Sequence, residues 1–156
     1  MAEALLISRA DVVKFTALNG NVDTDKFIQF VKIAQDVHIQ AILGTNLLNK
    51  LKADIVANTL SGNYLFLLTS YVKPMLIHWA MVEYLPFATY TIANKGVYKH
   101  ESENATSVDK NEIDFLVEKQ RQIAEHYSQR FVDYMMFNMA LFPEYNNNSN
   151  GNMYPK

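Results

Sequence analysis

Four histidines and one run of acidic side chains are the residues of this sequence whose types could do chemistry. His38, His78, His100 and His126 do not stand in the H-x-x-x-H or H-E-x-x-H spacing that sets two metal ligands on one helical face. His78 precedes Glu83 by five residues. Such a pair could transfer a proton or could satisfy two buried polar groups, and we favour the structural interpretation.

The acidic run lacks the order of a calcium loop. It has neither the D-x-[DN]-x-[DN]-G start nor the closing glutamate that a helix–loop–helix site needs. The five glycines stand singly, so no phosphate-binding loop is present, and the chain has no cysteine. Disulfides, Cys-ligated zinc and a Cys–His nucleophile are therefore excluded. We expect no enzyme, no metal and no cofactor. The acids of this run are Glu101, Glu103, Asp109, Glu112 and Asp114.

Composition and charge indicate one domain with a core and argue against a grip on nucleic acid. The 156 residues are 49% hydrophobic, and the net charge is −2 with a pI near 6.1. The fourteen basic residues are scattered, whereas a phosphate-binding domain gathers them on one face. A protein that surrounds DNA without gripping it fits this balance. Nine Tyr, nine Phe and seven Met also suggest contact with a partner, because these residue types are favoured at interface centres.

The elements that position these residues are arranged around the stretch 61–94. Between Ala53 and Asn94 the only charged residues are Asp54, Lys73 and Glu83. A segment that is apolar all round must be buried, either in a bundle core or in lipid. Lys73 interrupts the run of about 20 uncharged residues that a bilayer requires, so we expect a central core helix and no membrane.

Prolines and capping residues give the remaining boundaries. Pro74 and Pro86 should kink or break the central helix, which is predicted to close at 94–96. Ser8 and Asp11 resemble a capping box at the first helix, which should end at Asn19-Gly20. Further helices are expected at 23–43, 45–58 and 109–140. The stripe of the last helix comprises Ile113, Leu116, Val117, Gln120, Ile123, Ala124, Tyr127, Phe131, Tyr134, Met135 and Asn138.

The fold class is therefore all-α: a small bundle of about five helices with a long apolar central helix. Residues 97–107 have no helical period and should form a long loop before the last helix, with no strand. Residues 143–156 are rich in Asn and are expected to be an extended tail. We thus divide the chain into a bundle domain, 1–142, and a tail, 143–156. The apolar run at 4–7 is too short for a signal peptide, which predicts a cytoplasmic protein.

One pattern reaches beyond composition. An Ala-Gln dipeptide, an apolar run, Leu-Gly and a Leu-rich helix follow one another in FIQFVKIAQDVHIQAILGTNLLNKL, which spans 27–51. A helix with Trp and Tyr comes next, then NKGVYKHES at 94–102, a long helix, and FPEYNNN at 142–148. In this order the pieces resemble the head–tail connector (adaptor or ring) proteins of tailed bacteriophages. The likeness is greatest to those of Bacteroidetes phages, including the crAss-like group.

The resemblance implies a structural, non-enzymatic virion protein. Connector subunits form homo-oligomeric rings, typically twelve-fold, beneath the portal protein, and other connector or tail proteins dock on them. Genomic DNA passes through the ring without sequence-specific binding. The expected location is the virion neck, with the host cytoplasm before assembly.

A ring requires contacts between two different patches on each subunit. The 97–107 loop and the tail are the non-core segments expected to supply them. The candidate assembly residues are Val97, Tyr98, Lys99, His100, Glu101, Glu103, Glu144, Tyr145, Met153 and Tyr154.

Two other functions remain open. The first is a soluble cytoplasmic helical interaction domain, acting as a homodimer unrelated to virions. The second is a small helical enzyme or ligand binder that uses His78 and Glu83 with nearby tyrosines.

Overall fold

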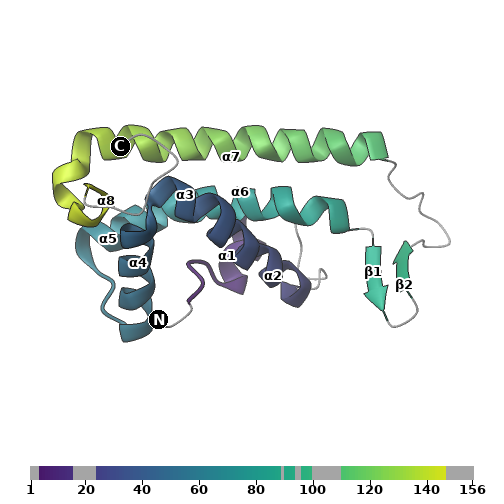
Figure 1. Ribbon diagram of the computed structural model, residues 1–156, viewed down its shortest axis with the longest axis horizontal. Coiled ribbons are helices and arrows are strands. Elements are labelled where there is room, and N and C mark those ends of the chain that lie inside the picture. The colour runs from purple at the N-terminus through teal and green to yellow at the C-terminus, as the bar shows by residue number, and fades with distance from the viewer. Residues whose placement is uncertain (1–3, 16–23, 89, 94–95, 100–109, 147–156) are drawn as a thin grey trace.

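Figure 1 shows the computed structural model, which describes residues 4–15, 24–88, 90–93, 96–99 and 110–146. The chain is a helical bundle in which two long antiparallel helical stretches lie side by side and shorter helices cover one of them. The predicted all-α fold is confirmed, with a small β-hairpin added at one end of the long axis.

The N-terminal helices are α1 (Arg9–Phe15), then α2 (Thr24–Ala34), which runs on through a π-helix η1 (Gln35–Ile39) into α3 (Gln40–Leu43), and α4 (Thr45–Ala57). The central stretch comprises α5 (Gly62–Leu67), a π-helix η2 (Leu68–Val72), α6 (Lys73–Tyr84) and a 3-10 turn η3 (Leu85–Phe87). The strands β1 (Tyr90–Ala93) and β2 (Gly96–Lys99) precede α7 (Lys110–Asn138), the 3-10 turn η4 (Met139–Leu141) and α8 (Pro143–Asn146).

Local sequence explains where the helices around α4 end. Gly44 has φ 84°, so the helix that ends at Leu43 stops where a residue without a Cβ can reverse the chain. Asn58 has φ 57° and its N–H donates to the carbonyls of Asp54 and Ile55. This left-handed stop is the conformation that Asn and Gly adopt most readily. The helices predicted at 23–43 and 45–58 are confirmed.

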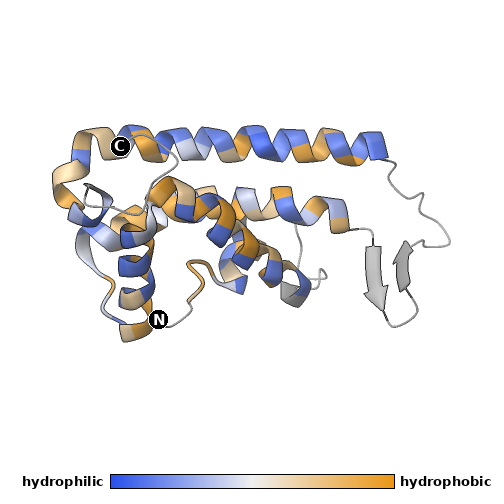
Figure 2. Cartoon of the chain, in the orientation of Figure 1, coloured by the Kyte–Doolittle hydropathy of each residue, from blue (hydrophilic) through white to orange (hydrophobic). Residues whose placement is uncertain are grey.

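The core is formed around α6. Seven of its twelve residues are buried, among them Met75, Leu76 and Ala80 at 0% exposed, because α2 packs on one side of it and α7 on another. By length and composition alone, the helical stretch Gly62–Phe87 could span a membrane, but more than half of its most apolar part is buried inside the protein. Burial against α2 and α7 accounts for its apolar character. Figure 2 shows the mixed colouring of the more polar α7 beside it.

The prediction that the central helix closes at 94–96 was wrong, as was the absence of strands. The helix ends at Phe87, and Tyr90–Ala93 pairs antiparallel with Gly96–Lys99, Ala93 opposite Gly96. Pro86 limits the helix because it has no N–H to donate. The residues that follow, such as Tyr90, Thr91 and Ile92, favour strands. Two short β-rich runs separated by two residues are a hairpin signal, but strands of four residues are too short to show a clear alternation.

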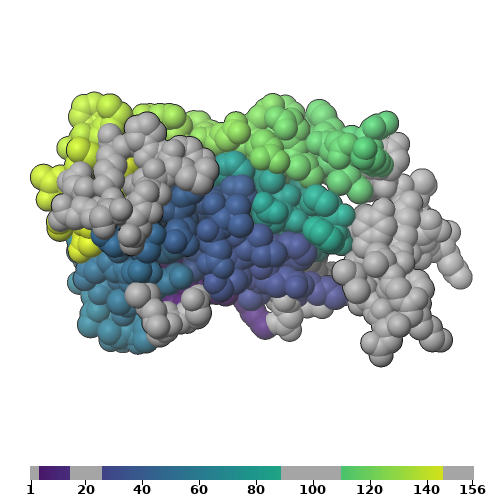
Figure 3. Space-filling view, in the orientation of Figure 1, coloured from purple at the N-terminus to yellow at the C-terminus, as the bar shows by residue number. Residues whose placement is uncertain are grey.

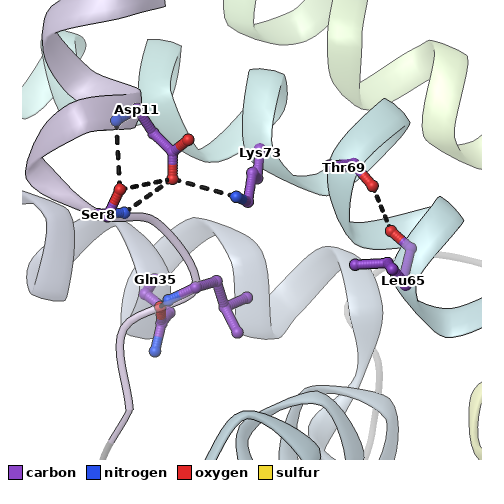
Figure 4. Close-up of polar contacts among 7 residues, drawn as sticks. Ser8, Asp11, Gln35, Leu65, Thr69 and Lys73 are labelled. Carbon is purple, nitrogen blue, oxygen red and sulfur yellow. Dashed lines mark hydrogen bonds and ion pairs between the residues drawn. The ribbon is translucent and has the colours of Figure 1, made fainter. Parts of the chain in front are cut away.

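Pro74 changes the central helix without ending it. The helical stretch passes through this residue, but the five residues before α6 form the π-helix η2. Proline cannot donate to the carbonyl four residues earlier and its ring crowds that carbonyl, and the wider π turn relieves both problems. The helix is therefore not broken at Pro74 as predicted; its hydrogen bonding changes to the π pattern just before this residue. The hydroxyl of Thr69 donates to the carbonyl of Leu65 in the same region (Figure 4).

The boundary predicted between bundle and tail also needs correction. Residues 143–146 form α8, and the side chain of Tyr145 is only 2% exposed, next to Phe142 at 0%. The Tyr145 ring meets Phe131 of α7 edge-on at 5.9 Å. The packed domain therefore extends to Asn146, because an aromatic side chain placed after Pro143 fills the end of the core. The remaining residues of the predicted tail, 147–156, lie outside the described residues.

The side-chain amide of Gln35 holds the N-terminal segment against the bundle (Figure 4). Gln35 is fully buried in η1; its Oε1 accepts from the Leu6 N–H at 2.9 Å and its Nε2 donates to the Ala4 carbonyl at 2.8 Å. The capping box is confirmed: the Ser8 N–H donates to Asp11 at 2.9 Å, and the Asp11 N–H donates back to the Ser8 hydroxyl at 3.3 Å. The predicted end of this helix at Asn19-Gly20 lies outside the described residues.

Lys73, the charge in the middle of the apolar stretch, forms an ion pair with α1 of the N-terminal segment. Its ammonium lies 3.1 Å from Asp11. Burial alone would raise the pKa of Asp11, but the hydrogen bonds from Ser8 and Lys73 outweigh burial, and the pKa lies below its usual value. The ion pair thus fixes α1 against the start of α6.

Replacing Gln35 by Ala should destabilise the bundle by about 2 to 3 kcal/mol, because the buried Leu6 N–H and the partly buried Ala4 carbonyl lose their partner. Urea unfolding of Gln35→Ala measures this loss, and hydrogen exchange at Leu6 should accelerate. The matched control is Gln29→Ala, at an exposed position of the same helical stretch, which should change stability by less than about 0.5 kcal/mol. Equal effects of the two substitutions would contradict the role given to Gln35.

Candidate assembly interface

The structure separates the candidate residues of the predicted loop. Val97, Tyr98 and Lys99 lie in β2, paired with Ile92, Thr91 and Tyr90 of β1. They belong to a hairpin at the end of the long axis and not to an irregular loop (Figure 1). His100, Glu101 and Glu103 lie outside the described residues.

The candidate residues of the predicted tail are also divided. Glu144 is half-buried, and its Oε2 accepts a hydrogen bond of 2.5 Å from the Tyr64 hydroxyl of α5. Tyr145 is buried in the core, so it cannot be the exposed anchor that the sequence suggested. Met153 and Tyr154 lie outside the described residues. The first part of the predicted tail therefore closes the bundle.

The histidines make structural contacts between helices. Glu83 pairs with His38, at 2.8 Å from its Nε2, and not with His78 as the sequence spacing suggested. The His38 ring stacks on Trp79 with centroids 4.1 Å apart, and the Trp79 Nε1 donates to the Ser128 hydroxyl at 2.9 Å. These contacts link η1, α6 and α7. Because His38 and Glu83 lie on different elements, their pairing could not be predicted from residue spacing along one helix.

His78 of α6 makes two further contacts with α7. Its Nδ1 lies 3.0 Å from the Gln120 Oε1, and its ring stacks parallel on Tyr127 at 5.2 Å. Among the residues that the structure describes, no group of three or more His, Asp or Glu side chains could hold a metal ion. The contacts of His38 and His78 are therefore hydrogen bonds and ring stacks that hold helices of the bundle together.

A surface that sequence reasoning missed lies along α5, η2 and the second half of α7. Arg130 stands over the rings of Tyr71 at 5.4 Å and Tyr127 at 5.7 Å. Tyr71 stacks on Tyr134 at 4.4 Å, and Phe66 approaches both tyrosines at 6.1 and 6.0 Å. Phe137 follows Tyr134 by three residues, on the same face of α7. We call this surface the arginine–aromatic patch: Phe66, Tyr71, Tyr127, Arg130, Tyr134 and Phe137.

Exposure distinguishes this patch from the core. Phe137 is 88% exposed and Phe66 is 50% exposed, and Met136, next to Phe137, is 64% exposed. Single exposed apolar residues are ordinary, but Phe66 belongs to a connected group of rings around an arginine, and Phe137 shares a helical face with two members of that group. Arg, Tyr, Phe and Met are the residue types enriched at protein interfaces. The high count of Phe, Tyr and Met was the signal in the sequence, but it did not show which of them stay uncovered.

Tyr64 connects this end of the bundle to α8. Burial, and then the hydrogen bond and negative charge of Glu144, raise the pKa of Tyr64 to about 12. The phenol therefore keeps its proton in the folded chain at pH values where the unfolded chain, with a pKa near 10, has lost it. The contribution of Tyr64 to stability should be constant below about pH 10 and should be lost as the pH rises from 10 to 12.

Tyr64→Phe should remove that part of the alkaline dependence and lower stability at neutral pH by about 1 to 2 kcal/mol, since one hydrogen bond to a carboxylate is lost. Unfolding free energies at several pH values measure both effects. Glu144→Gln is the companion variant: it keeps an acceptor but removes the charge that helps raise the pKa of Tyr64, so the alkaline decline should still begin near pH 10 but should be smaller and end at lower pH. An alkaline limb unchanged in Tyr64→Phe would contradict the assignment.

The fold and surface define a class of protein: a small helical bundle with side-chain hydrogen bonds between its helices and an exposed aromatic face. Residues 39–154 match the family model described as "Family of unknown function (DUF6712)". The match covers most of the chain, so the chain belongs to this family. It includes the whole arginine–aromatic patch. No curated protein and no solved structure matches the chain.

Proposed function

We propose that the chain is a structural virion protein: a head–tail connector subunit that forms a ring beneath the portal, extends the DNA channel and offers a docking surface for the tail. The arginine–aromatic patch is the observation that carries the proposal furthest. It supports a protein that works by assembling, because rings this exposed leave apolar surface in water that a neighbour would bury. The resemblance of the sequence to phage connectors supplies the kind of assembly.

The polar groups of the described chain fit this role. His38, Glu83, His78 and Lys73 all have protein partners across elements. A net charge of −2 suits a wall that DNA must pass without adhering to it.

Purified protein should form rings with a central hole, alone at high concentration or on a candidate portal protein. Light scattering gives the particle mass and negative-stain imaging gives the shape. A chain that stays monomeric and also ignores the portal would contradict the proposal. A closed dimer without portal affinity would favour the alternative, a helical interaction domain that acts as a homodimer.

The proposal also gives residues 147–156 a part in assembly. A chain ending at Asn146 keeps α8 and should show wild-type urea unfolding, but should form fewer rings or dock less on the portal. A chain ending at Phe142 is the contrasting variant. It loses Tyr145 and should be destabilised by about 3 to 5 kcal/mol, as for a buried aromatic truncated in a core. Wild-type assembly by the chain ending at Asn146 would remove the role given to these residues.

A further inference from the structure

A second apolar surface lies along α2 and η1. Ile33 of α2 is 41% exposed and Val37 of η1 is 57% exposed, about one helical turn further along the same continuous helical stretch. Phe30 lies on the same face, and its ring approaches Phe87 of η3 at 5.4 Å. Phe87 is itself 51% exposed. We call Phe30, Ile33, Val37 and Phe87 the α2 patch.

The two patches occupy different parts of the molecule. The arginine–aromatic patch is built on α5, η2 and the C-terminal half of α7. The α2 patch reaches η3, at the opposite end of the central helix (Figure 1). Tyr71 and Phe87 are 16 residues apart on that helical stretch, which corresponds to about 24 Å. In Figure 3, α2 forms part of the viewed face and α7 forms one long edge.

We infer that the arginine–aromatic patch of one copy of this chain binds the α2 patch of a second copy, head to tail. This inference rests on the proposed function and names the surfaces of its ring contact. A contact of one patch with its own twin would leave the other patch uncovered. A head-to-tail contact covers both on every copy, which is the geometry that closes rings.

Size supports a second copy as the occupant. Phe66 and Phe137 of the patch leave on the order of 300 Å² of apolar surface uncovered at their exposed fractions. A stable interface buries about 800 Å² on each partner, a little over half of it apolar. The partly exposed tyrosines and the exposed Arg130 add to this area, so the patch approaches the size of one such interface.

Charge also supports this pairing. Arg130 is exposed and carries the cation of the first patch. Asp36, beside Val37, carries the carboxylate of the second; it is 44% exposed, and its pair with Lys32 lies at the surface. Surface pairs of this kind contribute little, so Asp36 can turn to a partner at small cost. An arginine among rings facing a carboxylate beside an apolar stripe is a complementary contact.

The absence of cysteine permits a direct test by cross-linking. Phe137→Cys and Ile33→Cys replace exposed side chains, and each variant carries a single cysteine, so no disulfide can form within one chain. Mixing the two variants at high concentration under oxidation should give mixed dimers at several times the yield of a Phe137→Cys and Asp114→Cys mixture, whose second position is exposed on α7. No excess over this control would overturn the inference. Dimers of Phe137→Cys alone in equal yield would also overturn it.

Charge exchange provides the second test. Arg130→Asp and Asp36→Arg should each lower the yield of the cross-link, or of rings, by tenfold or more. Their 1:1 mixture should restore it, because every contact then joins one cation and one carboxylate. Lys119→Asp is the matched control: Lys119 also stands over a ring, Phe115 at 5.8 Å, but at the other end of α7, and its reversal should have no effect. A mixture no better than the single variants would overturn the pairing.

The two proposals fail separately. Rings that form on a portal without this cross-link would overturn only the assignment of the patches. A cross-link that forms while only open chains appear would leave the contact standing and overturn the ring.

Discussion

The need to bury α6, the apolar middle of the central helical stretch, governs this structure. Gly62–Phe87 is apolar around its whole circumference, and its middle carries a single charge, Lys73, which is neutralised by Asp11. Covering such a helix in water requires several neighbours. The α2 stretch and α7 supply the main contacts, and the N-terminal segment adds Leu6 and Ile7 at 2% and 4% exposed. Each neighbour is held in place by its contact with this helix, and its other face remains available.

Polar contacts decide which face of each neighbour points inward. Apolar packing alone tolerates several rotations of a helix, because one aliphatic side chain can replace another. The bond from Trp79 to Ser128 and the pair of His38 with Glu83 tolerate far fewer, because a misplaced polar group would lose its partner. They fix α7 and η1 around α6. Because Ser128 bonds to Trp79 and Phe131 is buried in the core, Arg130 and Phe137 lie on the outer face of α7.

The sequence predicted the helices well and the surfaces poorly, for physical reasons. The helices ending at Leu43 and Ala57 follow from periodicity and from the stop residues Gly44 and Asn58, which act locally. The hairpin at 90–99 was missed because strands of four residues carry little pattern. The burial of Tyr145 depends on a contact with Phe131, which no local pattern encodes. The apolar stripe expected on the last helix included Phe131 at 0% and Leu116 at 44% exposed, because a broad stripe does not show which edge a neighbour covers.

The π-helices have a consequence for the phase of the helices around them. A π turn holds one residue more than an α turn, and one residue corresponds to 100° of rotation in an α-helix. The single turn η2 therefore resets the direction of every side chain after it relative to α5. Glu83, which pairs with His38 of η1, and Trp79, which bonds to Ser128 of α7, both follow η2, so their directions depend on this turn. Phe66 precedes η2, so its direction does not. A chain shortened by one residue within 68–72 would retain its helix but rotate one half against the other. The length of this segment is thus constrained more tightly than the identity of its side chains.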